Sequence, residues 1–187
     1  MRFDGLMAGV LFTATLVGSG VASAQTTAQL SGQDKTFIAK AGEGSLKEIQ
    51  FSQLALQKSN SDDIKGFAQK MVTDHTQLIS DMKPFADQAG IPAPTELKPK
   101  DKAMYDELNG LSGTAFDKKY ISDMVKDHHK DVREFKMEAS ATTDPNFKST
   151  VENGEKVVHQ HMVMIDQIAK NKGVATPASA KTCTSGQ

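Results

Sequence analysis

The sequence is poor in the residues that mark several protein classes, with no tryptophan, two tyrosines and one cysteine among 187 residues. A single cysteine excludes a disulfide within the chain. Cys183 lies in a C-terminal segment, residues 174–187, whose small and polar residues predict a flexible tail. There the thiol is either inert or joins two chains through a disulfide, and the sequence leaves this open.

An excess of charge of one sign is also missing. Lysine and arginine together number 22 and aspartate and glutamate 23, which gives a net charge of −1. The sequence has no basic block that would follow a phosphate backbone. We therefore expect no nucleic-acid partner.

Long apolar runs are confined to the N-terminus. Arg2 is followed by the apolar run Leu6–Val17 and then by the small residues Ala22-Ser23-Ala24. This pattern predicts a secretory signal peptide, residues 1–24, cleaved before Gln25. The run is too short to span a bilayer as a helix, and no cysteine follows the cleavage site to carry a lipid anchor. We expect an exported, periplasmic mature chain without a transmembrane segment, and the sequence leaves association with the outer membrane open.

The rest of the chain shows helical periodicity and few strand signals. Apolar or small residues recur at alternating spacings of four and three, which predicts long helices over residues 34–58, 62–89, 114–141 and 145–172. Ser31 or Asp34 is suited to cap the first helix, while Gly90 and Gly173 are suited to end the second and the fourth. Residues 90–113 form a longer connection with a short helix near residues 100–108.

Two tight connections and one longer one predict an all-α fold, an antiparallel four-helix bundle over residues 34–173. Residues 25–33 would form an N-terminal extension. The longer connection between the second and third long helices allows either simple up-down order or a crossover of the ferritin type. The sequence does not decide between them.

One polar residue stands in each long helix where the apolar stripe demands a hydrophobic one. These residues are Glu48, His75, His128 and His161. Burial of a carboxylate or an imidazole is costly unless the group is paired. At a rise of about 1.5 Å per residue, all four lie near mid-helix in either order of the helices. We therefore expect the four side chains to meet in the core.

Two of the histidines end a repeated pentad, Met71-Val72-Thr73-Asp74-His75 and Met124-Val125-Lys126-Asp127-His128. The methionine lies four residues before the histidine, on the same helix face. The aspartate is rotated by about 100° and faces a neighbouring helix or solvent, so it is at most a partner of a ligand. His129 and His159 lie off the apolar stripes and are expected at the surface.

The cluster has two interpretations. One carboxylate and three imidazoles suit zinc, iron, manganese or Cu(II), and additional thioethers from Met71, Met124 and Met164 would favour Cu(I). Alternatively, Glu48 and the three histidines satisfy one another in a metal-free hydrogen-bonded network.

No sequence feature supports an enzyme. A di-iron oxidase needs a glutamate three residues before its histidines, where this chain has Val72, Val125 and Val158. Nucleophile motifs and phosphate loops are missing. Two hypotheses remain: a structural or stress-related interaction protein of the cell envelope, which binds an unknown envelope protein or itself, and a metal-handling protein for copper, zinc or iron.

Several segments together resemble the DUF4142 family of exported bacterial proteins of unknown function. They are Glu48-Ile49, Phe67–His75, Gly113–Tyr120, Met124–His128 and Val157–His161. The resemblance covers about residues 37–169. It implies a ferritin-like four-helix bundle in the periplasm or cell envelope, and it implies no established reaction.

Overall fold

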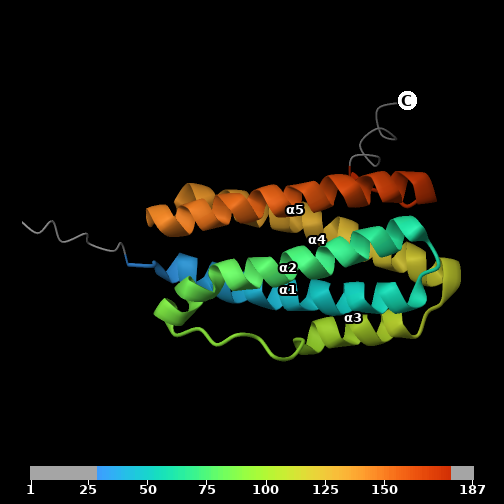
Figure 1. Ribbon diagram of the computed structural model, residues 1–187, viewed down its shortest axis with the longest axis horizontal. Helices are drawn as coiled ribbons and strands as arrows, with labels where there is room; N and C mark the ends of the chain where they lie inside the picture. The colour runs from blue at the N-terminus through green and yellow to red at the C-terminus, as the bar shows by residue number, and fades with distance from the viewer. Residues whose placement is uncertain (1–28, 178–187) are drawn as a thin grey trace, which may run out of the picture.

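The computed structural model describes residues 29–177, and in this part of the chain all regular structure is helical (Figure 1). Its five helices are α1 (Gly32–Lys58), α2 (Asp62–Ala89), α3 (Pro99–Asn109), α4 (Gly113–Ala141) and α5 (Pro145–Lys172). The four long helices match the predicted spans to within two residues, and α3 is the expected short helix. The predicted signal peptide and Cys183 lie outside the described residues. None of the helices within 29–177 is long and apolar enough to cross a membrane.

Local sequence signals set the helix ends. At the start of α1, Ser31 and Asp34 form a capping box: the Ser31 hydroxyl accepts from the Asp34 N–H at 3.1 Å, and Asp34 Oδ2 accepts from the Ser31 N–H at 2.7 Å. Helices α2 and α5 end at Gly90 and Gly173, whose φ angles of 69° and 66° are left-handed. Asp144 caps α5 by accepting from two backbone N–H groups.

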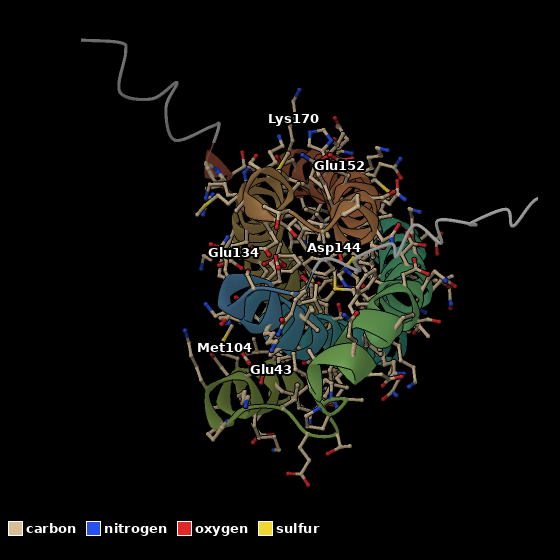
Figure 2. The ribbon with its side chains drawn as sticks, turned by 90° about the vertical axis from the view of Figure 1, so that its left-hand side faces the viewer. Glu43, Met104, Glu134, Asp144, Glu152 and Lys170 are labelled. Carbon is tan, nitrogen blue, oxygen red and sulfur yellow. The ribbon has the colours of Figure 1, made fainter. Side chains whose placement is uncertain are left out.

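The four long helices form a ring in the order α1, α2, α5, α4, and α3 lies outside it against α1 and α4 (Figures 1 and 2). Neighbours in the ring are antiparallel. Between α1 and α4, for example, Gln33 pairs with Glu138 near one end and Ser52 with Tyr120 towards the other, both at 2.9 Å.

The connection between α2 and α4 runs back along the helices, so that α4 starts at the end where α2 starts (Figure 1). The two short connections, α1 to α2 and α4 to α5, therefore lie at opposite ends. This arrangement answers the question of helix order that the sequence left open.

Two hydrophobic clusters fill the space between the helices. One contains Phe51, Phe67 and Tyr120, and the other contains Phe37 and Phe147. Along every long helix the first cluster lies on one side of the polar core residue and the second cluster lies on the other. The polar residues thus form a layer between two apolar halves of the core.

Candidate metal centre

The structure brings together the four polar residues that the sequence singled out. Glu48 comes from α1, His75 from α2, His128 from α4 and His161 from α5, and at most 2% of each residue is exposed. Each long helix supplies one side chain. The four side chains meet because the helices are antiparallel and each residue lies near the middle of its helix. The convergence therefore follows from helical phase and length.

The three imidazoles form a compact triangle. Their ring centroids are 6.0 Å apart for His75 and His128, 5.3 Å for His75 and His161, and 5.5 Å for His128 and His161. One nitrogen from each ring lies within 4.8 Å of one from each of the others. Phe67 closes one side, with its ring 6.0 Å from that of His128 and 6.2 Å from that of His161.

One nitrogen of each ring is held by a neighbouring polar group. Nδ1 of His128 donates to the backbone carbonyl of Met124 at 2.9 Å, and Nε2 of His161 donates to Asp74 Oδ2 at 2.8 Å. Nδ1 of His75 lies 3.3 Å from the Ser45 hydroxyl. These contacts set the orientation of each ring and leave the other nitrogen available, as in metal-binding histidines.

The remaining nitrogens are His75 Nε2, His128 Nε2 and His161 Nδ1, which are buried without a hydrogen-bond partner among residues 29–177. Buried polar atoms are rarely left in this state. The metal-free network would require Glu48 and the three imidazoles to satisfy one another, and only His75 Nε2 has such a neighbour, Glu48 Oε2 at 2.9 Å. His128 Nε2 and His161 Nδ1 have none in the described part of the chain.

Glu48 supplies the negative charge of the layer. Its Oε2 is 2.9 Å from His75 Nε2, without the alignment of a hydrogen bond, and its Oε1 is 3.5 Å from His128 Nδ1. Burial alone would raise the pKa of Glu48, but His75 and His128 outweigh it and lower this pKa to about 2. The carboxylate is therefore ionised at neutral pH.

The histidines differ in their protonation. Burial lowers the pKa of His128 and lowers that of His161 to about 4, so both rings are neutral at neutral pH and can act as ligands. Burial acts in the same direction on His75, but the adjacent Glu48 charge outweighs it and raises the pKa of His75.

The methionines of the two pentads lie next to the polar layer, on the side of the hydrophobic cluster that contains Phe67. Met71 and Met124 are fully buried in the cluster that contains Phe67, and Met164 packs at the edge of the same cluster. The polar contacts to the three imidazoles come from Ser45, Asp74, Glu48 and the Met124 carbonyl.

The aspartates of the two pentads have different partners. Asp74 binds His161 of another helix and Lys70, whereas Asp127 accepts from Lys47 at 2.6 Å. The repeat is therefore not a duplicated site with Asp and His acting together. His129, outside the layer, contacts Asp166 at 2.9 Å.

Sequence reasoning missed two residues beside the cluster. Ser45 is buried next to His75, three residues before Glu48 and so on the same face of α1. Lys47 is also buried, with its ammonium group 2.6 Å from Asp127 and 3.8 Å from Asp101. The spacing of three residues between Ser45 and Glu48 could have predicted that Ser45 lies beside the cluster. The partners of Lys47 depend on how α3 and α4 pack, which no local pattern shows.

Comparison with known proteins agrees with this architecture. The model of the family described as "Domain of unknown function (DUF4142)" matches residues 19–168. The chain belongs to the DUF4142 family. No protein with a curated description matches it.

Solved structures with a similar fold include two DUF305 proteins and CopM. The DUF305 protein from Streptomyces coelicolor has a TM-score of 0.66 at 13% identity over 78% of this chain and 96% of that one. A fragment from Deinococcus radiodurans gives 0.63 at 13% identity over 76% and 97%. CopM in its Cu(I)-bound form gives 0.64 at 22% identity over 76% and 98%. At these identities the likeness of the DUF4142 chain to each of them concerns the fold alone.

Proposed function

We propose that this protein binds a transition-metal ion between His75, His128 and His161. The observation that carries the proposal is a triangle of three buried imidazoles, in which one nitrogen of each ring lies within 4.8 Å of one from each of the others. Within it, His128 Nε2 and His161 Nδ1 have no hydrogen-bond partner among residues 29–177. A single cation would be bound by all three imidazoles once it displaces the proton of His75 Nε2, which the adjacent Glu48 charge otherwise holds there. The Glu48 carboxylate, 2.9 Å from His75, supplies compensating charge or a fourth ligand.

Copper is the preferred ion. Imidazoles suit copper, zinc and iron alike, and thioethers favour Cu(I) among these. Met71 and Met124, each one turn from a histidine of the triad, would supply the thioethers, and Met164 is a further candidate. The similarly folded CopM was solved in a Cu(I)-bound form, which supports copper over zinc or iron. A di-iron centre is disfavoured because valines occupy the positions of its bridging glutamates.

The proposal includes the fold and the cellular location. We assign the ring of antiparallel helices with its crossover connection to the ferritin-like four-helix bundles. The positive charge of Arg2 near the N-terminus and the Ala22-Ser23-Ala24 cleavage motif support export to the periplasm. N-terminal sequencing of the protein from periplasmic extract should begin at Gln25, and a chain that retains Met1 would contradict export.

The competing function is a structural or stress-related envelope protein whose polar layer binds no metal. The contacts of Glu48 with His75 and His128 favour it, because they balance part of the buried charge internally. It would act on an envelope protein or on a second copy of itself. This function requires that the three inner nitrogens remain without a ligand.

Elemental analysis separates the two functions. The protein is purified untagged from the periplasm without added metal, beside a His75→Ala/His128→Ala variant. A His129→Ala/His159→Ala variant serves as the control, because it removes two histidines from outside the triad. Metal binding predicts stoichiometric copper in the wild type and in the control, and its loss from the triad variant. Sub-stoichiometric metal at the same level in all three proteins would reject metal binding by the triad.

A further inference from the structure

A cavity of about 230 Å³ lies between α1, α4 and the start of α3. Six carboxylates and three ammonium groups line it: Glu43, Glu48, Asp101, Asp127, Asp131 and Glu134, with Lys40, Lys47 and Lys130. Figure 2 shows its rim residue Glu134 on the face between α4 and α1. A cleft with such an excess of negative charge raises the local concentration of cations.

A second cavity of about 50 Å³ continues this space towards the histidines. It adds Ser45 and His75, and the residues it shares with the outer cavity are Lys40, Gly44, Glu48, Lys130, Asp131 and Glu134. The lining thus runs from a partly exposed carboxylate at the surface to one member of the triad. Glu48 stands where the two cavities meet.

One atom at this junction points to a ligand independently of the surface charges. Glu48 is 2% exposed, and its Oε1 has no hydrogen-bond partner in the described part of the chain. His128 Nδ1 lies 3.5 Å from it but donates its hydrogen bond to the Met124 carbonyl. A buried carboxylate oxygen without a donor is what a cation passing through the cavity would coordinate.

Two of the three lysines of the lining, Lys47 and Lys130, form ion pairs with carboxylates other than Glu48, while Lys40 lines both cavities without a carboxylate partner in the described residues. Lys47 is engaged by Asp127 at 2.6 Å, and Lys130 is engaged by Glu134 at 3.0 Å and by Asp131 at 3.5 Å. Each of these two ammonium groups therefore faces carboxylates of the rim or wall. With six carboxylates and three lysines the lining has a formal excess of negative charge. Burial and the Glu48 charge reduce this excess near neutral pH, because they raise the pKa of Asp131 to about 7.

We infer that the two cavities form the route by which a divalent cation reaches the three histidines, with Glu48 Oε1 as the last carboxylate ligand before His75. The inference rests on the proposed metal-binding function and adds where the ion enters and in which form. Carboxylate oxygens suit divalent ions better than Cu(I), so the ion on this route is Cu²⁺ or Zn²⁺, bound at the end of the route by the imidazoles and Glu48 without a change of oxidation state.

The first test changes the charge of the route. Binding of Cu²⁺ alone is followed by stopped-flow quenching of tyrosine emission, which no tryptophan obscures. In an Asp131→Asn/Glu134→Gln variant we expect the association rate at low ionic strength to fall by about threefold to tenfold and to depend less on salt. The dissociation rate should not change. An Asp81→Asn/Glu152→Gln variant, with the same loss of charge on exposed positions of α2 and α5, should associate like the wild type.

The second test narrows the route without a change of charge. A Cβ added at Gly44 meets nothing within 4 Å, and the same holds at Gly66 in α2, which is exposed and lies outside the lining. Gly44→Leu should slow association and dissociation together and leave the equilibrium affinity unchanged, because an obstacle alters the barrier and not the end states. Gly66→Leu should alter neither rate.

The outcomes separate this inference from the proposed function. If the wild type binds Cu²⁺ through the triad but Asp131→Asn/Glu134→Gln and Gly44→Leu keep wild-type rates, the route is wrong and the metal site stands. If the wild type shows no saturable uptake, the metal site and its route both fail. Circular dichroism confirms that each variant is folded before its rates are compared.

Discussion

Asp74 of α2 accepts a hydrogen bond from Nε2 of His161 in α5 at 2.8 Å, and so orients one of the three rings of the candidate metal centre. Burial alone would raise the pKa of Asp74, but hydrogen bonds from Lys70 and His161 outweigh it and lower this pKa. The aspartate is therefore ionised and holds the proton of His161 on Nε2. The lone pair of Nδ1 is thereby kept for a metal.

Loss of this contact should weaken metal binding without removal of a ligand. We expect Asp74→Ala to reduce copper affinity by about 10-fold to 100-fold, the usual effect of the loss of a partner that orients a ligand. Competition with a chromophoric chelator measures the affinity. Asp166→Ala is the matched control, because it removes the carboxylate beside His129, which lies outside the triad. Equal affinities for both variants would show that Asp74 does not orient a ligand.

Metal removal should lower thermal stability. An ion that binds only the folded state stabilises it by about 2.7 kcal/mol at a free concentration of 100 times its Kd. For a domain of this size that corresponds to a rise of roughly 5–10 °C in Tm. Melting curves recorded with copper and with a chelator measure the difference. The His75→Ala/His128→Ala variant should show no difference, and a chelator effect that survives in this variant would place the metal elsewhere.

The fold and the members of the cluster were predictable because their signals are local. Ser31, Gly90 and Gly173 mark helix ends through their own backbone chemistry. The helix face on which Glu48 or His75 lies, and hence its position in the core, can be read from the apolar residues one turn away. Antiparallel helices of similar length then bring mid-helix residues together, whichever way the chain crosses.

The partners of the cluster were not predictable, since they depend on which helices are neighbours in the ring. The pentads give Asp74 and Asp127 equivalent local settings, yet one binds His161 and the other Lys47. The difference arises because α2 packs against α5 while α4 packs against α1 and lies near α3. No periodicity within one helix carries that information.

Gly154 of α5 packs without room for a side chain against Phe135 of α4 and Leu78 of α2. A Cβ at this position would lie 2.5 Å from Cε1 of Phe135 and 3.3 Å from Cδ2 of Leu78. We expect Gly154→Ala to lower the free energy of unfolding by about 1–3 kcal/mol, the usual cost of overpacking. Gly66→Ala, in open space on α2, should instead raise it by about 0.5–1 kcal/mol through helix propensity. Urea denaturation measures both, and a stable Gly154→Ala variant would mean that Phe135 can move aside.

A pair of acidic side chains joins the start of α1 to the end of α4. Asp34 and Glu138 are both buried, and Oδ1 of the first and Oε1 of the second have no hydrogen-bond donor among residues 29–177. Burial raises the pKa of Glu138, and the Asp34 charge acts in the same direction. For Asp34 burial also acts upward, but hydrogen bonds from Glu138 and the Ser31 backbone outweigh it and lower its pKa. These opposite shifts mean that a proton shared by the two carboxyl groups would reside on Glu138 and not on Asp34.

A proton shared in this way makes stability depend on pH in a defined direction. Because the folded-state pKa of Glu138 lies above its unfolded value, the stability gained from its proton is present in acid and is lost as pH rises through the raised value. Glu138→Gln puts a permanent N–H donor in the same place, so the variant should be more stable than the wild type by about 1 kcal/mol at about pH 8, with a smaller difference at about pH 5. Urea denaturation at the two pH values checks this, with the exposed Glu152→Gln of α5 as a control that should change little at either. If Glu138→Gln is less stable than the wild type at both, the carboxylate itself stabilises the helix ends and no proton is shared.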